Sequence, residues 1–338
     1  MNPKEQSNIQ NISCCSLAVF AGLGVYFGIA NALGVSRMPA LLIGLAITVL
    51  MLLLYRFLIS KGASGQPARY LALLPLPGVM IIISINYCGI INLWKEMAIV
   101  DTPFFYYALI AAALLVLAGL SGDKGLLRAC PIICISIIII ALFDTVLILS
   151  KAEPSLVFQG VAKPAGQIVQ GGAEISVALL APGVLLLLFL FIQKSQKSDM
   201  ITGKGLLMGL IFPVVYLIIE LIRDLLLFGD LIALDKYPII RTLKTVYFGV
   251  GVSRLEFLGI TVLSLGALTA IMLEFIVLSK LTENVFNLNK KYLIPIEVVL
   301  ILVLSTVFYH FGQNIWVIAE AGAILLLFAY PLILILKK

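Results

Sequence analysis

Long apolar stretches, separated by short polar segments, follow one another along almost the whole chain. Ten of them can be placed, and each is continuously apolar rather than alternating. Each is close to the ~20 residues that a helix needs to cross a bilayer. Backbone polar groups in lipid need partners within the chain, so spanning segments are helices or closed barrels. The pattern therefore predicts an all-α membrane protein with ten transmembrane helices.

The ten predicted helices divide into two sets of five. The first set is Ser13–Leu33, Pro39–Leu58, Leu71–Trp94, Pro103–Leu120 and Cys130–Ser150, and the second is Gly172–Ile192, Leu206–Phe228, Phe257–Ser279, Tyr292–His310 and Asn314–Leu336. The first stretch lacks a signal-peptide pattern, so we expect it to be a permanent span. The connections are short, which predicts a single polytopic domain over residues 1–338.

Composition and charge agree with lipid as the solvent. Hydrophobic residues make up 62% of the chain and charged residues only 12%. More than half of the 23 basic residues fall on the side that also holds both termini, among them Lys194, Lys197, Lys290 and Lys291. Cytoplasmic loops are enriched in Lys and Arg, which places both termini in the cytoplasm. The net charge of +6 then reflects topology and contact with anionic lipid rather than nucleic-acid binding.

Residues typical of catalytic or metal chemistry are sparse. The five cysteines lie within or at the ends of apolar spans, and the chain has one histidine. Cys130 and Cys134 are one helical turn apart, a spacing more typical of packing than of metal binding. No phosphate-binding loop, nucleophile elbow or zinc motif is present. We expect no enzymatic activity, no metal site and no cofactor.

Two predicted helices carry breaks at corresponding positions of the two halves. The first span has Gly22 and Gly24 near its centre, and the sixth has Ala181-Pro182-Gly183. Matched Gly/Pro interruptions in two halves are typical of transporters built from inverted repeats. We therefore predict a five-plus-five repeat, about residues 13–150 and 172–336, with helices one and six unwound around a central ligand site. The alternative is that these small residues only allow close helix packing.

Polar residues within apolar spans extend this hypothesis. Ser84 and Tyr87 share a face of the third span and are candidate ligand contacts, with Asn86 beside them. Acids interrupt several later spans, at Asp144, Glu220, Glu274, Glu297 and Glu320. A charge at the bilayer centre is costly, so such residues usually face a cavity or a partner. Glu274 lies deepest and is the candidate coupling group, with a packed neutral carboxyl as the alternative. Glu297 and Glu320 are expected to pair with polar neighbours, and Glu220, Arg223 and Asp224 to form an ion-pair cluster.

The segment after the seventh span carries a family resemblance. It contains Tyr237-Pro238 and then Arg254-Leu-Glu256 at the start of the eighth span, and Asp101-Thr102-Pro103 and Gly125-Leu-Leu-Arg128 precede spans four and five. These features resemble the endospore germination permeases, the B subunits of nutrient germinant receptors. The resemblance covers nearly the whole chain. Ala181-Pro182-Gly183-Val184 departs from it, because many relatives have an aromatic–small–acidic stretch there.

The resemblance implies a fold, partners and a location. It implies the amino acid–polyamine–organocation transporter fold, with an A subunit and a lipoprotein C subunit as partners in the spore inner membrane. We expect Tyr237, Pro238, Arg254 and Glu256 to form an outer lid over the ligand site. The leading hypothesis is a receptor subunit that senses a small nutrient such as an amino acid. The alternatives are a proton-coupled amino-acid transporter and a ligand-independent scaffold for partner subunits.

Overall fold

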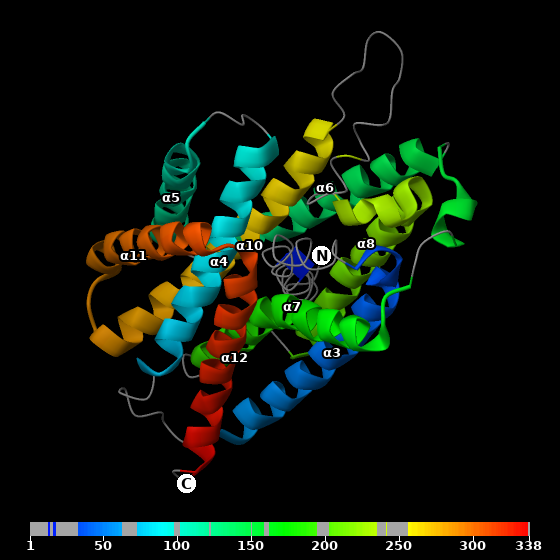
Figure 1. Ribbon diagram of the computed structural model, residues 1–338. Coiled ribbons are helices and arrows are strands. Elements are labelled where there is room, and N and C mark those ends of the chain that lie inside the picture. Colours follow the sequence, from blue (N-terminus) through cyan, green and yellow to red (C-terminus); the bar gives the residue numbers. More distant parts are fainter. Residues whose placement is uncertain are drawn as a thin grey trace, which may run out of the picture.

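The structure is a bundle of long helices (Figure 1). The computed structural model describes residues 13, 16–17, 33–62, 73–97, 102–121, 123–149, 151–158, 162–194, 203–234, 241 and 256–336. Its helices are η2 (Gly34–Ser36), α3 (Arg37–Gly62), α4 (Pro75–Met97), α5 (Phe104–Ser121), α6 (Asp123–Leu149), η4 (Pro154–Phe158), α7 (Ala165–Lys194), α8 (Gly203–Phe228), η5 (Gly229–Leu234), α10 (Glu256–Phe286), α11 (Lys290–Phe311) and α12 (Gln313–Leu336). No β-strand occurs in this part of the chain.

The long helices coincide with the apolar stretches of the sequence. Each of the nine α-helices in the described residues covers one predicted span, from the second to the tenth. The first predicted span lies almost entirely outside the described residues. Eight of the described helices are long and apolar enough to cross a membrane. The chain is therefore a multi-pass membrane protein.

Local sequence signals set some helix ends. Asn289 precedes α11, and its side chain accepts a hydrogen bond from the backbone N–H of Lys291 at 3.1 Å. Such a cap satisfies one of the backbone donors that the first helical turn leaves free. Gly312 ends α11 with a φ of 79°, a conformation that glycine adopts without strain. The chain then reverses directly into α12.

Helix α4 lies at the centre of the bundle. All residues from 82 to 93 are buried, and α4 packs against α5, α10, α11 and α12. Figure 1 shows α5 and α11 on one side of the bundle and α6 and α8 on the other. Large apolar side chains such as Leu50, Ile132, Ile318 and Leu325 point outward. An apolar exterior of this kind is suited to contact with lipid.

Helices α3 and α7 form the most extensive helix pair among the described residues. A Cβ atom added to Gly44 would lie 2.9 Å from the carbonyl oxygen of Gly172, and one added to Gly183 would lie 2.8 Å from Leu52 Cδ2. Thr48 at the same interface bonds the Gly44 carbonyl of its own helix at 2.7 Å. Small residues thus let the two backbones approach closely, as is typical of membrane helices. We refer to Gly44, Gly172 and Gly183 as the glycine seam.

The predicted break in the sixth span is wrong. Helix α7 runs without interruption from Ala165 to Lys194, with Pro182 inside it, so Ala181-Pro182-Gly183 is helical. Proline removes one backbone hydrogen bond from a helix, but membrane helices tolerate it where neighbours cover the site. Here Gly183 lies against Leu52 of α3, which favours the packing interpretation. The matching positions Gly22 and Gly24 lie outside the described residues.

Candidate functional site

A hydrogen-bonded pair joins the middle of α4 to the middle of α10. Asn86 Nδ2 donates to both carboxyl oxygens of Glu274, at 3.0 and 3.2 Å, and both residues are buried. About two turns further along α4, Trp94 Nε1 donates to Ser264 Oγ at 2.7 Å. Residue numbers rise along α4 as they fall along α10, so the two helices are antiparallel. Glu274, the candidate coupling residue, therefore faces the central helix of the bundle.

Helix α12 brings a second carboxyl to this level. A Cβ atom added to Gly78 of α4 would lie 2.9 Å from the Ala323 carbonyl oxygen. At the other end of α4, Lys95 bonds the hydroxyl of Tyr309, just before α11 turns into α12. Helices α4 and α12 are therefore antiparallel as well. Side chains on a helix tilt toward its N-terminus, so Asn86 and Glu320, which lies one turn before Ala323, tilt in opposite directions along the bundle axis, each toward the level of the other.

We call Asn86, Glu274 and Glu320 the carboxyl cluster. Glu320 is fully buried and interacts electrostatically with Glu274. Both oxygens of Glu320 and the Oδ1 oxygen of Asn86 are buried and have no hydrogen-bond partner. Buried polar atoms are nearly always paired in folded proteins. Three unpaired oxygens in one cluster mark it as the least satisfied polar site in the described part of the bundle. The expectation that Glu320 pairs with a polar neighbour is therefore wrong.

A third buried carboxyl, that of Glu297, lies on α11 and is satisfied by hydroxyl groups of α10. Ser279 Oγ donates to Glu297 Oε2 at 2.6 Å, and the hydroxyl of Thr282 donates to the other oxygen. Glu297 on α11 is buried between these hydroxyls. The prediction that Glu297 pairs with polar neighbours is confirmed. Its role in the structure is to join α10 to α11.

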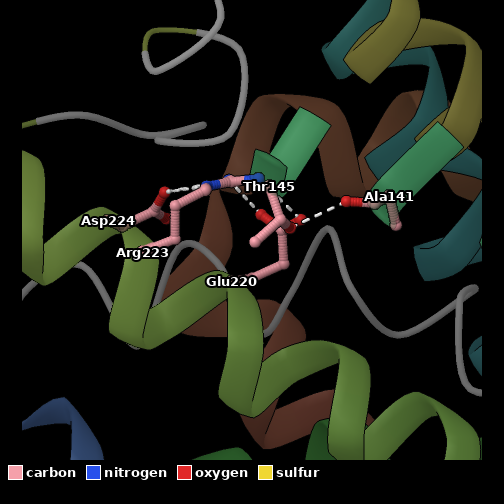
Figure 2. A network of polar contacts seen from close by, with 5 residues as sticks. All are labelled: Ala141, Thr145, Glu220, Arg223 and Asp224. Atoms are coloured by element: carbon pink, nitrogen blue, oxygen red, sulfur yellow. Dashed lines mark hydrogen bonds and ion pairs between the residues drawn. The ribbon is translucent and has the colours of Figure 1, made fainter. Parts of the chain in front are cut away.

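The predicted ion-pair cluster on α8 is confirmed. Figure 2 shows Arg223 between Glu220 and Asp224, facing Thr145 and Ala141 of α6. Arg223 forms salt bridges with both acids, with Nη1 donating to Glu220 Oε1 at 2.9 Å and Nε donating to Asp224 Oδ1 at 3.2 Å. All three residues are buried. The positive charge of Arg223 offsets acidic charge inside the bundle at the α6–α8 contact.

The predicted ligand residues that are described all have partners within the protein. Ser84 Oγ donates to the Met80 carbonyl of its own helix at 2.7 Å. The Tyr87 hydroxyl donates to the Ala108 carbonyl of α5. Ala181, Pro182 and Gly183 are buried on α7. The structure thus directs Tyr87 toward α5 and Gly183 toward α3, and a shared role in ligand binding stays a prediction.

The predicted lid is described at one position. Glu256 is the first residue of α10. Tyr237, Pro238 and Arg254 lie outside the described residues, as does most of the segment between α8 and α10. Asp144 belongs to α6, but its side chain lies outside the description. The lid therefore stays a prediction.

Two further polar features were not found from the sequence. Arg37 at the start of α3 is buried, and its Nε and Nη1 atoms have no hydrogen-bond partner. The Asp230 carboxylate of η5 accepts a hydrogen bond from Val35 N at 2.9 Å, beside Gly34, whose φ is 54°. Both residues follow or precede apolar spans, where the sequence pattern indicates ordinary boundary charges. Only the tertiary structure reveals the burial of Arg37 and the contact of Asp230 with Val35, where η5 packs against η2.

Metal binding has no visible basis in the described residues, where no group of three His, Cys, Asp or Glu residues could hold a metal ion. The cysteines of this part, Cys88, Cys130 and Cys134, are buried and are not in disulfides. This agrees with packing as the role predicted for Cys130 and Cys134. The chemistry available at the carboxyl cluster is thus that of oxygen acids and an amide in an apolar interior.

Comparison with known proteins identifies the family. No curated protein matches the chain by sequence. Among solved structures, a crystal structure of a manganese transporter from Eremococcus coleocola, in complex with an aromatic bis-isothiourea substituted compound, matches with 15% identity over 99% of this chain and 78% of that chain, at a TM-score of 0.47. The sequence also matches the spore permease family, described as spore germination protein, over residues 76–314. This match covers more than half of the chain, from α4 to the start of α12, and it confirms the resemblance seen in the sequence. The chain belongs to the spore germination permease family.

Proposed function

We propose that this protein is the membrane-embedded subunit of a nutrient germinant receptor. It senses a small nutrient such as an amino acid in the spore inner membrane, and it works with an A subunit and a lipoprotein C subunit to trigger germination. The observation that carries this proposal is the family match over residues 76–314. The proposal includes ten spans in a five-plus-five repeat, both termini in the cytoplasm, and no enzymatic activity or cofactor.

The proposed mechanism is a ligand-dependent shift between two arrangements of the bundle. A ligand shifts such an equilibrium only by its differential affinity for the two states. The nutrient binds between the first, third, sixth and eighth predicted spans, near Gly22, Gly24, Ser84 and Tyr87. Substituting Gly24 by leucine should then abolish the nutrient response while leaving the amount of protein in the spore largely unchanged.

Two other functions are each favoured by one observation. Buried carboxyls on α10 and α12 suit a proton-coupled amino-acid transporter, because intramembrane acids commonly serve as proton relays. The uninterrupted α7 suits a scaffold that anchors partner subunits without binding a ligand. All three functions are compatible with a helical bundle of this family.

Uptake and germination measurements separate these functions. Purified protein in proteoliposomes with an imposed pH gradient is tested for uptake of labelled amino acids, and spores lacking the protein are tested for germination on a panel of nutrients. A receptor subunit gives no uptake, and its loss removes the response to a defined nutrient class. Uptake that follows the pH gradient would identify a transporter. A scaffold would be identified by two results together. Loss of the protein would lower the levels of the A and C subunits, and substitutions at Gly24 or Tyr87 would leave the nutrient response unchanged.

A further inference from the structure

We propose that the carboxyl cluster is a binding site for one exchangeable proton, which Glu320 carries beside the ionised carboxylate of Glu274. The inference concerns chemistry within the bundle and does not depend on which nutrient, if any, the protein senses. It also moves the proton-carrying role from Glu274, the coupling residue expected from sequence, to Glu320 on α12. The hydrogen-bonding capacities of the three side chains support this assignment.

Asn86 distinguishes the two carboxyls. Its amide group has two N–H donors on Nδ2 and one acceptor oxygen, Oδ1. Nδ2 donates to both oxygens of Glu274, at 3.0 and 3.2 Å. An ionised carboxylate can only accept hydrogen bonds, and N–H donors of this kind stabilise its negative charge. Glu274 is thus placed to hold the negative charge of the cluster.

Glu320 has the opposite environment. Neither of its oxygens has a donor, it is fully buried, and the Glu274 carboxyl interacts with it electrostatically. An ionised, unpaired carboxylate in an apolar interior is strongly disfavoured, and a second carboxylate nearby adds repulsion. A protonated carboxyl carries no charge and offers one O–H donor. In the proposed arrangement this O–H donates to the unpaired Asn86 Oδ1, and one proton then gives a partner to two of the three unpaired oxygens.

Two other buried ionisable groups on the surrounding helices, Glu297 and Tyr87, are engaged elsewhere. Glu297, on α11, accepts bonds from Ser279 and Thr282. Tyr87, on α4, donates to Ala108. No Lys or Arg of the described residues forms an ion pair with either carboxyl of the cluster. The charge of Glu320 is therefore not offset by a basic side chain in this part of the protein.

A proton suits the site better than a metal cation. Hard cations such as Ca²⁺ take six to eight oxygen ligands, and Mg²⁺ requires nearly octahedral coordination. The cluster offers two carboxyls and one amide oxygen, and Asn86 Nδ2 already occupies both oxygens of Glu274. All three residues are buried. A proton needs one donor–acceptor pair and no coordination shell.

The position of Glu320 gives the proton a structural consequence. Helix α12 contacts α4 on one side and the α3–α7 pair on another. Loss of the proton would place a second negative charge between α12 and α10, and like charges at short range repel. Proton occupancy is therefore coupled to the packing of α12 between the two groups of helices.

Infrared difference spectroscopy on the purified full-length protein tests the proposal. A protonated buried carboxyl has a carbonyl stretch that is separate from carboxylate bands and shifts on H/D exchange. We expect this band in the wild-type protein and its loss in Glu320→Gln. Glu274→Gln and Glu297→Gln, which make the same change at the neighbouring buried carboxyls, should retain it. Monodisperse elution and unchanged helix content establish that each variant is folded.

A second variant keeps the test decisive if Glu320→Gln does not fold. Asn86→Leu has a similar volume but lacks the acceptor Oδ1, so the band should persist and move to the frequency of an acid without an acceptor. The proposal is overturned if the wild type lacks the band, if Glu320→Gln retains it, if Glu274→Gln removes it, or if Asn86→Leu leaves it unmoved. Disappearance of the band on adding NaCl or MgCl₂ at constant pH would show a metal-cation site instead.

Discussion

Buried charged side chains in this bundle are stabilised in three different ways. Arg223 lies between two acids, Glu297 accepts hydrogen bonds from two hydroxyls, and Glu320 has no partner at all. In an apolar interior an ion pair repays its desolvation cost only when its geometry and hydrogen bonds are good. Arg223 meets this condition with its two acids, and the Glu297 carboxyl is satisfied by its two hydroxyl donors. Glu320 is satisfied only with a bound proton, as proposed above.

The Arg223 cluster should be sensitive to removal of its cation. Arg223→Met keeps a long apolar side chain but leaves Glu220 and Asp224 without their shared guanidinium. Breaking a buried ion pair in this way typically costs about 3–5 kcal/mol. We expect a loss of that size in the free energy of unfolding, measured by titrating the purified protein from mild detergent into SDS.

An exposed pair supplies the matched control. Lys290 and Glu283 are 3.4 Å apart, with side-chain exposures of 38% and 42%. Exposed ion pairs contribute only ~0–1 kcal/mol, so Lys290→Met should change the unfolding free energy little. Equal losses for Arg223→Met and Lys290→Met would contradict a structural role for the buried cluster.

The helix pair α3–α7 shows how close packing is built at the scale of elements. The glycine seam brings the two backbones within contact of each other, so the Gly44 position has no space for a side chain. Prolines and glycines in such helices are compatible with a continuous helix, as Pro182 in α7 shows. The same residue types therefore occur in continuous and in interrupted membrane helices.

Gly44→Ala should separate α3 from α7. The added methyl group would lie 2.9 Å from the Gly172 carbonyl oxygen, and backbone atoms cannot move aside as a flexible side chain can. Overpacking of this kind typically costs about 1–3 kcal/mol, which the melting temperature of the purified protein will report. Gly322→Ala on α12 has open space at the new methyl group and should be neutral or slightly stabilising. If the Gly44→Ala variant had the same melting temperature as Gly322→Ala, close packing at the glycine seam would be refuted.

Substitutions at the start of α10 can test the predicted outer lid over the ligand site. We expect Arg254→Ala and Glu256→Ala to weaken nutrient-triggered germination well beyond any loss in protein level. Glu256 opens α10, and an acid in a first helical turn contributes only about 0.3–1 kcal/mol through the helix dipole. That contribution alone is too small to abolish a response. Normal germination of both variants across a nutrient titration would leave these residues as markers of the membrane boundary.

The described part of the bundle is organised around α4 and α12. Helices α4, α5, α10 and α11 pack together, α3 packs with α7, and α12 contacts both groups. A change in the packing of α12 would therefore alter its contacts with both groups of helices. This arrangement gives the carboxyl cluster, which lies between α4, α10 and α12, a position from which it can influence the whole bundle.

Membrane topology is testable by cysteine labelling. With the native cysteines replaced by serine, single cysteines are introduced at Ala162, before α7, and at Ser198, after it. The predicted orientation requires that position 162 react with an impermeant thiol reagent from outside and position 198 only from the cytoplasm. Labelling of position 162 solely from the cytoplasm would reverse the orientation of the bundle.

The sequence by itself determined the helices, their number in the described region and their lipid environment. Hydropathy is a local property, so α4, α5 and α12 begin and end within a few residues of their predicted bounds. The burial of Glu220, Glu274, Glu297 and Glu320 was likewise predictable, because each interrupts an apolar span. Sequence motifs were also sufficient to indicate the family.

Only the tertiary structure decided what each buried group touches. Asn86 and Glu274 are 188 residues apart in the chain, and no local pattern reveals that they bond. The prediction for Ala181-Pro182-Gly183 failed for the same reason, since the seam partner Leu52 lies on another helix. Partner choice depends on how helices rotate and pack against one another. That information is carried by contacts between distant segments and not by any single stretch of sequence.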